Sequence, residues 1–233
     1  MKNSPSRRQF HAIWRLLIAI PFLTAATLTA SAATHSPAKP SVSTLVSRVD
    51  HHYNSIRSLE VQFVQTYNGM GMSKRQSGAL LLKKPGLMRW TYTDPDGKLY
   101  ILNLKYGYFY TPGQNQAQRI PAKNIDDIQS PLRFLLGHTR LERELSGLRI
   151  ASQQSGNFTL QGTPRRMGKQ ITSLSLTVTP QGIIRQIRIV EADGVTNEFQ
   201  FSGETDNVPA PASAFEFHPP NGVAIVDGSS PLQ

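Results

Sequence analysis

Apolar residues recur at helical spacing near residue 50, at Val42, Leu45, Val46, Val49, Tyr53, Ile56 and Leu59. Residues at this spacing share one face of a helix. Ser41, which precedes them, can cap the first turn by accepting a backbone hydrogen bond. The pattern predicts an amphipathic helix that lies on a hydrophobic core.

After this segment, apolar residues recur at every second position, which is typical of strands with one buried face. Val61, Phe63, Gln65 and Tyr67 share one parity, and Gly69-Met70-Gly71 follows them as a turn. Further strands are predicted over 76–83 and 88–94, on either side of Pro85-Gly86, and over 98–104 and 106–111. The alternation returns after Gly147 in five more segments, at Leu148/Ile150, Phe158/Leu160, Leu174/Leu176/Val178, Ile187/Ile189 and Phe199/Phe201.

Residues 122–146 interrupt the strands. Ser130 followed by Pro131 is typical of a helix start, and Gly137 would end that helix, whose apolar members are Leu132, Leu135 and Leu136. About ten strands in hairpin order predict a mainly β fold built on one curved antiparallel sheet. Short helices can cover the apolar face of such a sheet but cannot fill a wide barrel. The sequence therefore predicts an apolar cavity under a helical lid.

The first 32 residues have the features of an export signal. Four basic residues without an acid precede an apolar run from Leu16 to Thr29, and Ala30-Ser31-Ala32 is a small-residue cleavage site. A membrane anchor is the competing interpretation, which Pro21 makes less suitable. The start also resembles a twin-arginine signal at Arg7-Arg8, although an ordinary basic start explains it as well. We expect residues 1–32 to be a signal peptide, 33–41 a Pro/Ser linker and 42–233 a single domain.

Composition narrows the function further. Removal of the four signal residues with positive charge leaves 21 basic against 15 acidic residues, a balance that favours acidic partners or anionic membrane surfaces. A nucleic-acid partner is not expected, because export removes the protein from the compartment that holds nucleic acid. The chain has no cysteine, so it offers neither a disulfide nor a thiol for lipid attachment. The mature protein is therefore expected to be soluble and not tethered to a membrane.

The chain offers little for catalysis or metal binding. His51 and His52 are adjacent on the predicted helix and point apart, so they do not converge on one metal ion. There is no Gly-x-Ser-x-Gly elbow, and Gly69-Met70-Gly71 lacks the rest of a phosphate loop. Asp94 and Asp96 are better explained by hairpin turns. No enzymatic activity and no cofactor are expected.

One run of residues carries a family resemblance: Gly78, Leu80, Leu82, Lys84-Pro85, Met88, Trp90 and Pro95. Their spacing resembles that of the LolA family of periplasmic lipoprotein carriers. Other segments agree in order, namely Phe63-Val64-Gln65, Tyr108-Phe109-Tyr110-Thr111-Pro112, Ser130-Pro131 and Phe217-His218-Pro219-Pro220-Asn221-Gly222-Val223. The resemblance implies an incompletely closed β-barrel that shields acyl chains.

The resemblance also implies the residues and partners of the site. The lipid-binding residues are expected at Phe63, Leu81, Met88, Trp90, Tyr92, Phe109, Leu132 and Leu135. The implied partners are acylated lipoproteins, a LolCDE-like inner-membrane transporter and a LolB-like outer-membrane receptor, with the carrier itself a monomer. Two alternatives stay open: a LolA-like carrier of another acylated lipid, such as a glycolipid or pigment, and a module that senses lipoproteins.

Lys84 departs from the family pattern, in which arginine usually precedes the turn proline and latches the lid. Lysine supplies donors but lacks the planar fork of arginine. The other interpretation of Lys83-Lys84 is a basic hairpin edge that deters aggregation. We expect Lys84 to be a lid latch that donates to carbonyls of residues 122–146 or of the first helix.

Overall fold

The computed structural model describes residues 39–125, 140–167 and 169–228. Its contacts separate Met1–Ala38 from Lys39–Gln233, and the fold below is that of the second unit. The expected signal peptide and the expected helix from Ser130 to Gly137 lie outside the described residues, so both stay predictions.

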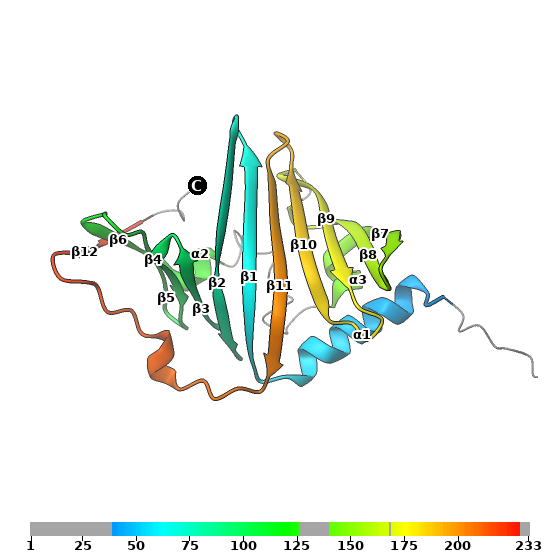
Figure 1. Ribbon diagram of the computed structural model, residues 1–233, viewed down its shortest axis with the longest axis horizontal. Helices are drawn as coiled ribbons and strands as arrows, with labels where there is room; N and C mark the ends of the chain where they lie inside the picture. Colours follow the sequence, from blue (N-terminus) through cyan, green and yellow to red (C-terminus); the bar gives the residue numbers. More distant parts are fainter. Residues whose placement is uncertain (1–38, 126–139, 168, 229–233) are drawn as a thin grey trace, which may run out of the picture. The chain divides into compact units, whose positions relative to one another are not determined.

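One twelve-stranded sheet forms the fold (Figure 1). Its strands run in the order β12-β6-β5-β4-β3-β2-β1-β11-β10-β9-β8-β7. The bounds are β1 Ser58–Gly69, β2 Met72–Lys83, β3 Leu87–Asp94, β4 Asp96–Leu102, β5 Tyr106–Tyr110, β6 Gln116–Pro121, β7 Leu145–Gln154, β8 Asn157–Pro164, β9 Ile171–Val178, β10 Ile184–Glu191, β11 Thr196–Asp206 and β12 Ala224–Asp227. Strands β12 and β7 lie at the two edges, so the sheet is curved but not closed.

The expected mainly β, incompletely closed architecture is confirmed. Neighbouring strands are antiparallel, with the exception of the parallel pair β12 and β6. These two strands were not expected from the sequence. Strand β6 reads Gln-Ala-Gln-Arg-Ile-Pro, and its two buried residues, Ala117 and Ile120, are three positions apart. They therefore lie on opposite faces of the strand, so the sequence shows no alternation there.

Helix α1, Val42–Ser55, begins where the sequence predicts it. The Ser41 hydroxyl accepts from the Thr44 backbone N–H at 3.1 Å, and Leu45, Val46, Val49 and Tyr53 are buried. The helix ends earlier than its apolar spacing suggests: Ile56 is already extended, and Leu59 belongs to β1, where it is buried in the same core. Two short helices, α2 Ala122–Ile125 and α3 Leu141–Glu144, flank residues 126–139. Among the residues with described placement, no helix is long and apolar enough to cross a membrane.

Helix α1 lies at one end of the strands, beside the β2–β3 and β9–β10 turns (Figure 1). The Arg48 guanidinium donates to the Pro180 carbonyl at 2.6 Å, and the Lys84 ammonium donates to the Tyr53 carbonyl. We call this the helix end of the sheet. The opposite end, which carries the β1–β2 turn at Met70-Gly71, is called the distal end.

The register of β1, β2 and β3 sorts their side chains onto two faces. Val61, Leu80 and Trp90 lie opposite one another across the three strands, as do Leu59, Leu82 and Met88. All six are buried. We call this the inner face, because it forms one hydrophobic core with α1.

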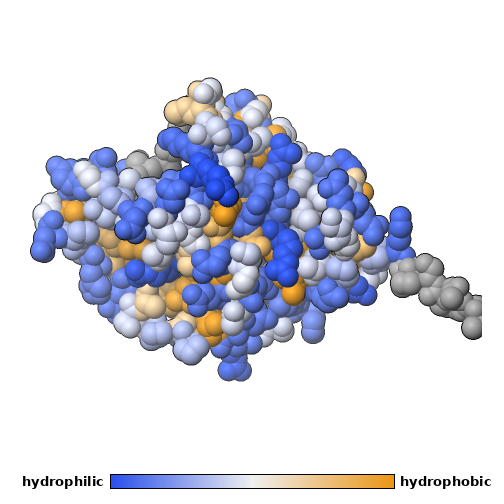
Figure 2. Space-filling model, in the orientation of Figure 1, coloured by the Kyte–Doolittle hydropathy of each residue, from blue (hydrophilic) through white to orange (hydrophobic). Residues whose placement is uncertain are grey.

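The outer face of β2–β6 has its own cover, the C-terminal segment 207–223, which includes a 3-10 turn, η2, at Ala212–Phe215 (Figure 1). Arg89 donates to the Ala214 carbonyl at 3.0 Å, and Lys83 donates to the Ala210 carbonyl at 2.7 Å. Phe217 stacks on Tyr108 with 5.1 Å between ring centroids. Figure 2 shows hydrophobic side chains among polar ones over this half of the sheet, whereas the face over β8–β11 is mainly polar.

Candidate functional site

A cluster of aromatic rings occupies the middle of the inner face. The Phe63 ring lies edge-on to Trp90 at 4.7 Å and to Tyr92 at 5.1 Å between centroids, and Trp90 contacts Phe199 at 5.5 Å. The Trp90 indole N–H points at the Met88 sulfur at 2.7 Å. Edge-on pairs of this kind are favoured by the ring quadrupoles. The cluster therefore gives the inner face a packed aromatic centre.

Gly78 allows these rings to meet. It lies between Phe63 of β1 and Tyr92 of β3 in the register, at a bulge in the β2–β3 pairing. A Cβ atom at Gly78 would lie 2.1 Å from the Thr91 carbonyl oxygen and 2.8 Å from the Tyr92 Cα. A larger residue would push β3 away from β2, since backbone atoms cannot give way as a flexible side chain can.

Four of the expected lipid-binding residues lie together in this interior. Phe63, Met88, Trp90 and Tyr92 are each less than a tenth exposed. Phe109 is partly buried and stacks on Tyr100 at 4.4 Å, next to the cluster. Leu132 and Leu135 lie outside the described residues, so their expected role stays a prediction.

Leu81 does not lie with them. It pairs with Arg89 and Glu60, is partly exposed, and has the opposite parity to Leu80 and Leu82. Leu81 therefore lies apart from the other expected residues, and its lipid-binding role stays a prediction; three successive leucines leave the parity of the strand undefined in the sequence. Pairing with Trp90 and Met88 assigns Leu80 and Leu82 to the interior instead. Phe199 and Phe201 also belong to the interior. Their alternation in the sequence predicts a strand, but it does not show that their side chains lie on the same face of the sheet as Trp90.

Polar groups appear on the inner face toward the distal end. The Tyr92 hydroxyl donates to Gln65 Oε1 at 3.2 Å, and the Gln65 amide donates to Asn197 Oδ1 at 3.0 Å. Burial raises the pKa of Tyr92 to about 12, so the hydroxyl keeps its proton as a donor. The inner face is thus apolar at its centre and hydrogen-bonding at the distal end.

The helix end is held by a network around the last turn of α1. Tyr53 donates its hydroxyl proton to Glu204 Oε2 at 2.8 Å and accepts from the Ile184 backbone N–H at 3.0 Å. His52 Nε2 lies 2.7 Å from Glu204 Oε1. The hydrogen bond with Glu204 raises the pKa of His52, which favours the imidazolium. A bulge in β11, with Gly203 at φ 65°, accompanies the turn of Glu204 toward the helix.

Lys84 adds a second attachment for the same turn. Its ammonium donates to the Tyr53 carbonyl, one of the last carbonyls of the helix, which lacks a partner within the helix. Partial burial lowers the pKa of this ammonium. The geometry thus joins the β2–β3 turn to α1; whether the contact works as a lid latch stays a prediction.

His52, Glu204 and Asp206 bring potential ligand atoms within 4.8 Å of one another. A metal ion could be held by such a set in principle. Glu204, however, already receives hydrogen bonds from His52 and Tyr53, and the positive charge of Lys84 acts on His52. These groups fit an attachment for α1 better than a metal site.

Comparison with known proteins identifies the family. Residues 54–218 match the family model described as outer membrane lipoprotein carrier protein LolA. The chain belongs to the LolA family. The matched LolA region includes the aromatic cluster, Lys84 and the C-terminal segment to His218.

Two curated proteins with the description outer-membrane lipoprotein carrier protein are similar over most of their length. The one from Chromobacterium violaceum is 26% identical over 201 residues, which cover 86% of this chain and 96% of the relative. The one from Photorhabdus laumondii is 30% identical over 174 residues, which cover 74% of this chain and 82% of the relative. Among solved structures, an uncharacterized conserved protein from Thermus thermophilus aligns with a TM-score of 0.52 at 11% identity, over 80% of this chain and 98% of that one. The likeness to this structure concerns the fold alone.

Proposed function

We propose that this chain is a periplasmic chaperone that carries lipoproteins toward the outer membrane and holds their acyl chains against the inner face of the sheet. The observation that carries the proposal is the buried aromatic interior around Phe63 and Trp90 in a chain of the LolA family. Its relatives are described as outer-membrane lipoprotein carrier proteins. A carrier needs no reaction chemistry, and its task is to keep acyl chains from water.

The energetics explain how a carrier can both hold and release such cargo. Each acyl methylene taken out of water is worth about 0.8 kcal/mol, so one long chain could gain roughly 10 kcal/mol. At the centre of the inner face, Trp90 contacts the rings of both Phe63 and Phe199. An acyl chain has to separate those rings before it can enter. The lost ring contacts reduce the net affinity, and their recovery drives release.

Helix α1 is the element that has to move for the interior to open. It covers the core at the helix end and is attached there by side-chain contacts to Glu204, Lys84 and Pro180. Hydrogen bonds of this kind contribute about 1 kcal/mol each. A modest number of such bonds suits a cover that opens for cargo and closes without it.

The route of the cargo follows from the same proposal. Loading would come from a LolCDE-like transporter of the inner membrane, and delivery would go to a LolB-like receptor of the outer membrane. The chain offers no cysteine for a lipid anchor, which suits a carrier that moves between two membranes.

Native mass spectrometry of the protein purified from a periplasmic extract tests the function directly. The expected result is a population that carries the mass of a triacylated lipoprotein, which detergent removes. The emission of Trp90 should shift when the purified protein, freed of residues 1–32 and hence of Trp14, is saturated with a triacylated lipopeptide. A protein that carries no acylated species and shows no emission change would contradict the proposal.

A further inference from the structure

Lys98 is a partly buried cation on the inner face near the distal end. It belongs to β4, at the register shift between Asp96 and Leu99, and lies two residues before Tyr100, which is on the inner face opposite Trp90. Its ammonium lies 4.4 Å from the centroid of the Tyr92 ring and donates to Gln76 Oε1 at 2.8 Å. The side chain therefore crosses over β3 and reaches β2, with its charge directly above the aromatic interior.

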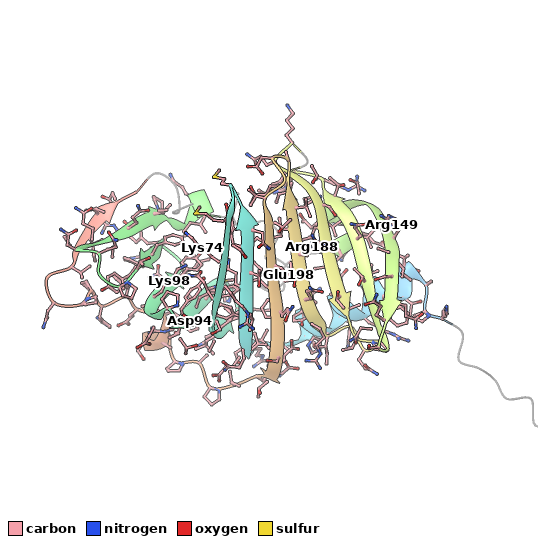
Figure 3. All side chains as sticks on the ribbon, turned by 45° about the horizontal axis from the view of Figure 1, so that its top comes forward. Lys74, Asp94, Lys98, Arg149, Arg188 and Glu198 are labelled. Atoms are coloured by element: carbon pink, nitrogen blue, oxygen red, sulfur yellow. The ribbon has the colours of Figure 1, made fainter. Side chains whose placement is uncertain are left out.

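The ammonium of Lys98 forms no ion pair in the described part of the chain. The ion pairs found there involve Glu204, Asp206, Asp227 and Glu216. The charged group that acts on it is Lys74, another cation, from the distal part of β2. Figure 3 shows Lys74 and Lys98 beside β2, together with Asp94 from the end of β3, which forms no ion pair with either lysine among the described contacts. Partial burial and Lys74 both lower the pKa of Lys98.

Such an arrangement is costly without a ligand, because a partly desolvated ammonium beside a like charge loses hydration that a neutral amide and an aromatic ring replace only in part. An oxyanion would supply the missing charge and accept hydrogen bonds from Lys98. Charge-assisted bonds of this type are about twice as strong as neutral ones. Two side-chain amides stand at the same end of the inner face: the Gln76 oxygen accepts from Lys98 and the Asn197 oxygen accepts from Gln65. Each of these amides also carries an NH2 group, which is the kind of donor that an oxyanion accepts from.

We propose that Lys98, assisted by Lys74, binds an oxyanion, either carboxylate or phosphate, at the polar end of an acylated ligand whose chains occupy the inner face. This site rests on the proposed function, because it needs acyl chains in the interior. The polar end stays at the distal end of the sheet, next to Tyr92, while the chains reach toward Trp90 and Phe63. The protein therefore prefers acylated ligands that carry a negative charge within a few bonds of the ester or amide.

The test compares acyl ligands that differ in charge but share one chain. Displacement of the neutral probe N-phenylnaphthylamine is measured with palmitate, palmitoyl lysophosphatidylglycerol and neutral monopalmitoylglycerol, each below its micelle concentration. Lys98→Met keeps the aliphatic stem and removes the charge. It should weaken both anionic ligands roughly tenfold, the equivalent of about 1.4 kcal/mol, and leave monopalmitoylglycerol within about twofold. Lys98→Arg should restore the preference.

Lys105→Met is the matched control, since Lys105 is an exposed lysine in the turn between β4 and β5 at the helix end. It removes the same charge from the molecule and should leave all three affinities unchanged. If Lys98→Met and Lys105→Met lose the same affinity for the anionic ligands, the effect comes from the net charge of the protein, and the proposed site is wrong. Equal affinities of the unmodified protein for charged and neutral ligands would overturn it as well.

Two further arms identify the source of the oxyanion and separate the site from the function. A triacylated cysteine peptide with aspartate as its second residue is compared with the same peptide carrying asparagine. Tighter binding of the aspartate peptide assigns the oxyanion to the lipoprotein cargo, and a preference confined to lysophosphatidylglycerol and palmitate assigns it to a free lipid. If no acyl ligand displaces the probe, the proposed function fails. If all displace it equally, the function stands and the oxyanion site is wrong.

Discussion

At the scale of single residues, Leu80 and Leu81 offer the sharpest test of the two faces. They are neighbours in β2, but Leu80 is fully buried on the inner face, whereas Leu81 is partly exposed on the outer one. Leu80→Gln places an amide without a partner in the apolar interior, which should destabilise the fold by about 3 kcal/mol. It should also weaken binding of acyl ligands. Leu81→Gln should change neither by much.

Thermal unfolding and probe displacement measure the two effects. Similar losses of stability and of acyl binding in both variants would mean that the acyl chains do not lie on the inner face. The same comparison extends to Met88→Glu, which puts a carboxylate beside Trp90 and should abolish transfer of a labelled lipoprotein.

Lys83 and Lys84 form a second pair of neighbours with different partners. Lys84 donates to Tyr53 of α1, and Lys83 donates to Ala210 of the C-terminal segment. Lys84→Met should free the last turn of α1 and slow the release of cargo to a LolB-like receptor, because closure of the helix helps to expel the acyl chains. Lys84→Arg should restore transfer through its additional donors.

Lys83→Met is the control for this experiment, since it removes a charge from the adjacent position without touching α1. Hydrogen exchange of the α1 amides reports the attachment directly. If transfer and exchange are the same in Lys84→Met, Lys83→Met and the unmodified protein, Lys84 is a hairpin residue without a role as a latch.

At the scale of elements, α1 should be held more firmly at mildly acidic pH. The Glu204 carboxylate raises the pKa of His52, with further support from Asp206 and opposition from Lys84 and from burial. A raised folded-state pKa means that the stabilisation is complete below the unfolded value near 6.5 and is lost as the pH rises through the folded value. Exchange protection of the α1 amides should therefore be greater at pH 6 than at pH 8, after correction for the intrinsic rate.

His52→Ala should abolish this dependence, while His51→Ala, at the exposed neighbouring position, should keep it. If the pH dependence of exchange persists in His52→Ala, it arises from another titrating group. Glu204→Gln provides an independent check, because it keeps the hydrogen-bonding shape and removes the charge.

The elements also show what the sequence could predict. Strong alternation located ten strands, and helical spacing with Ser41 located α1. Strands β6 and β12 were not predicted, because their few apolar residues show no clear alternation. Strand β12 also lies at an edge of the sheet, where it pairs in parallel with β6. The family resemblance and parity placed Met88, Trp90 and Tyr92 in one interior. Lys98 and the network of Glu204 could not be predicted, because the register shifts opposite Thr91–Thr93 in β3–β4 and at Glu60–Gln62 in β1–β11 change parity locally.

At the scale of the whole domain, the sheet has two covers with different tasks. Helix α1 lies on the inner core, and the C-terminal segment lies on the outer face of β2–β6 (Figure 1). Acyl chains that enter the inner face compete with α1 but not with the C-terminal segment. Loading with a triacylated lipopeptide should therefore increase hydrogen exchange in α1 and leave the amides of β12 and η2 unchanged.

This difference follows from the geometry of the two attachments. The C-terminal segment is held by parallel pairing of β12 with β6 and by the Phe217–Tyr108 stack, and neither contact shares a residue with the aromatic interior. The attachments of α1, in contrast, include Tyr53, whose ring is part of the core. Exchange measured by mass spectrometry with and without lipopeptide decides the point. If loading loosens both covers equally, the sheet deforms as a whole and α1 is not the lid; if it loosens only the C-terminal segment, the cargo lies on the outer face.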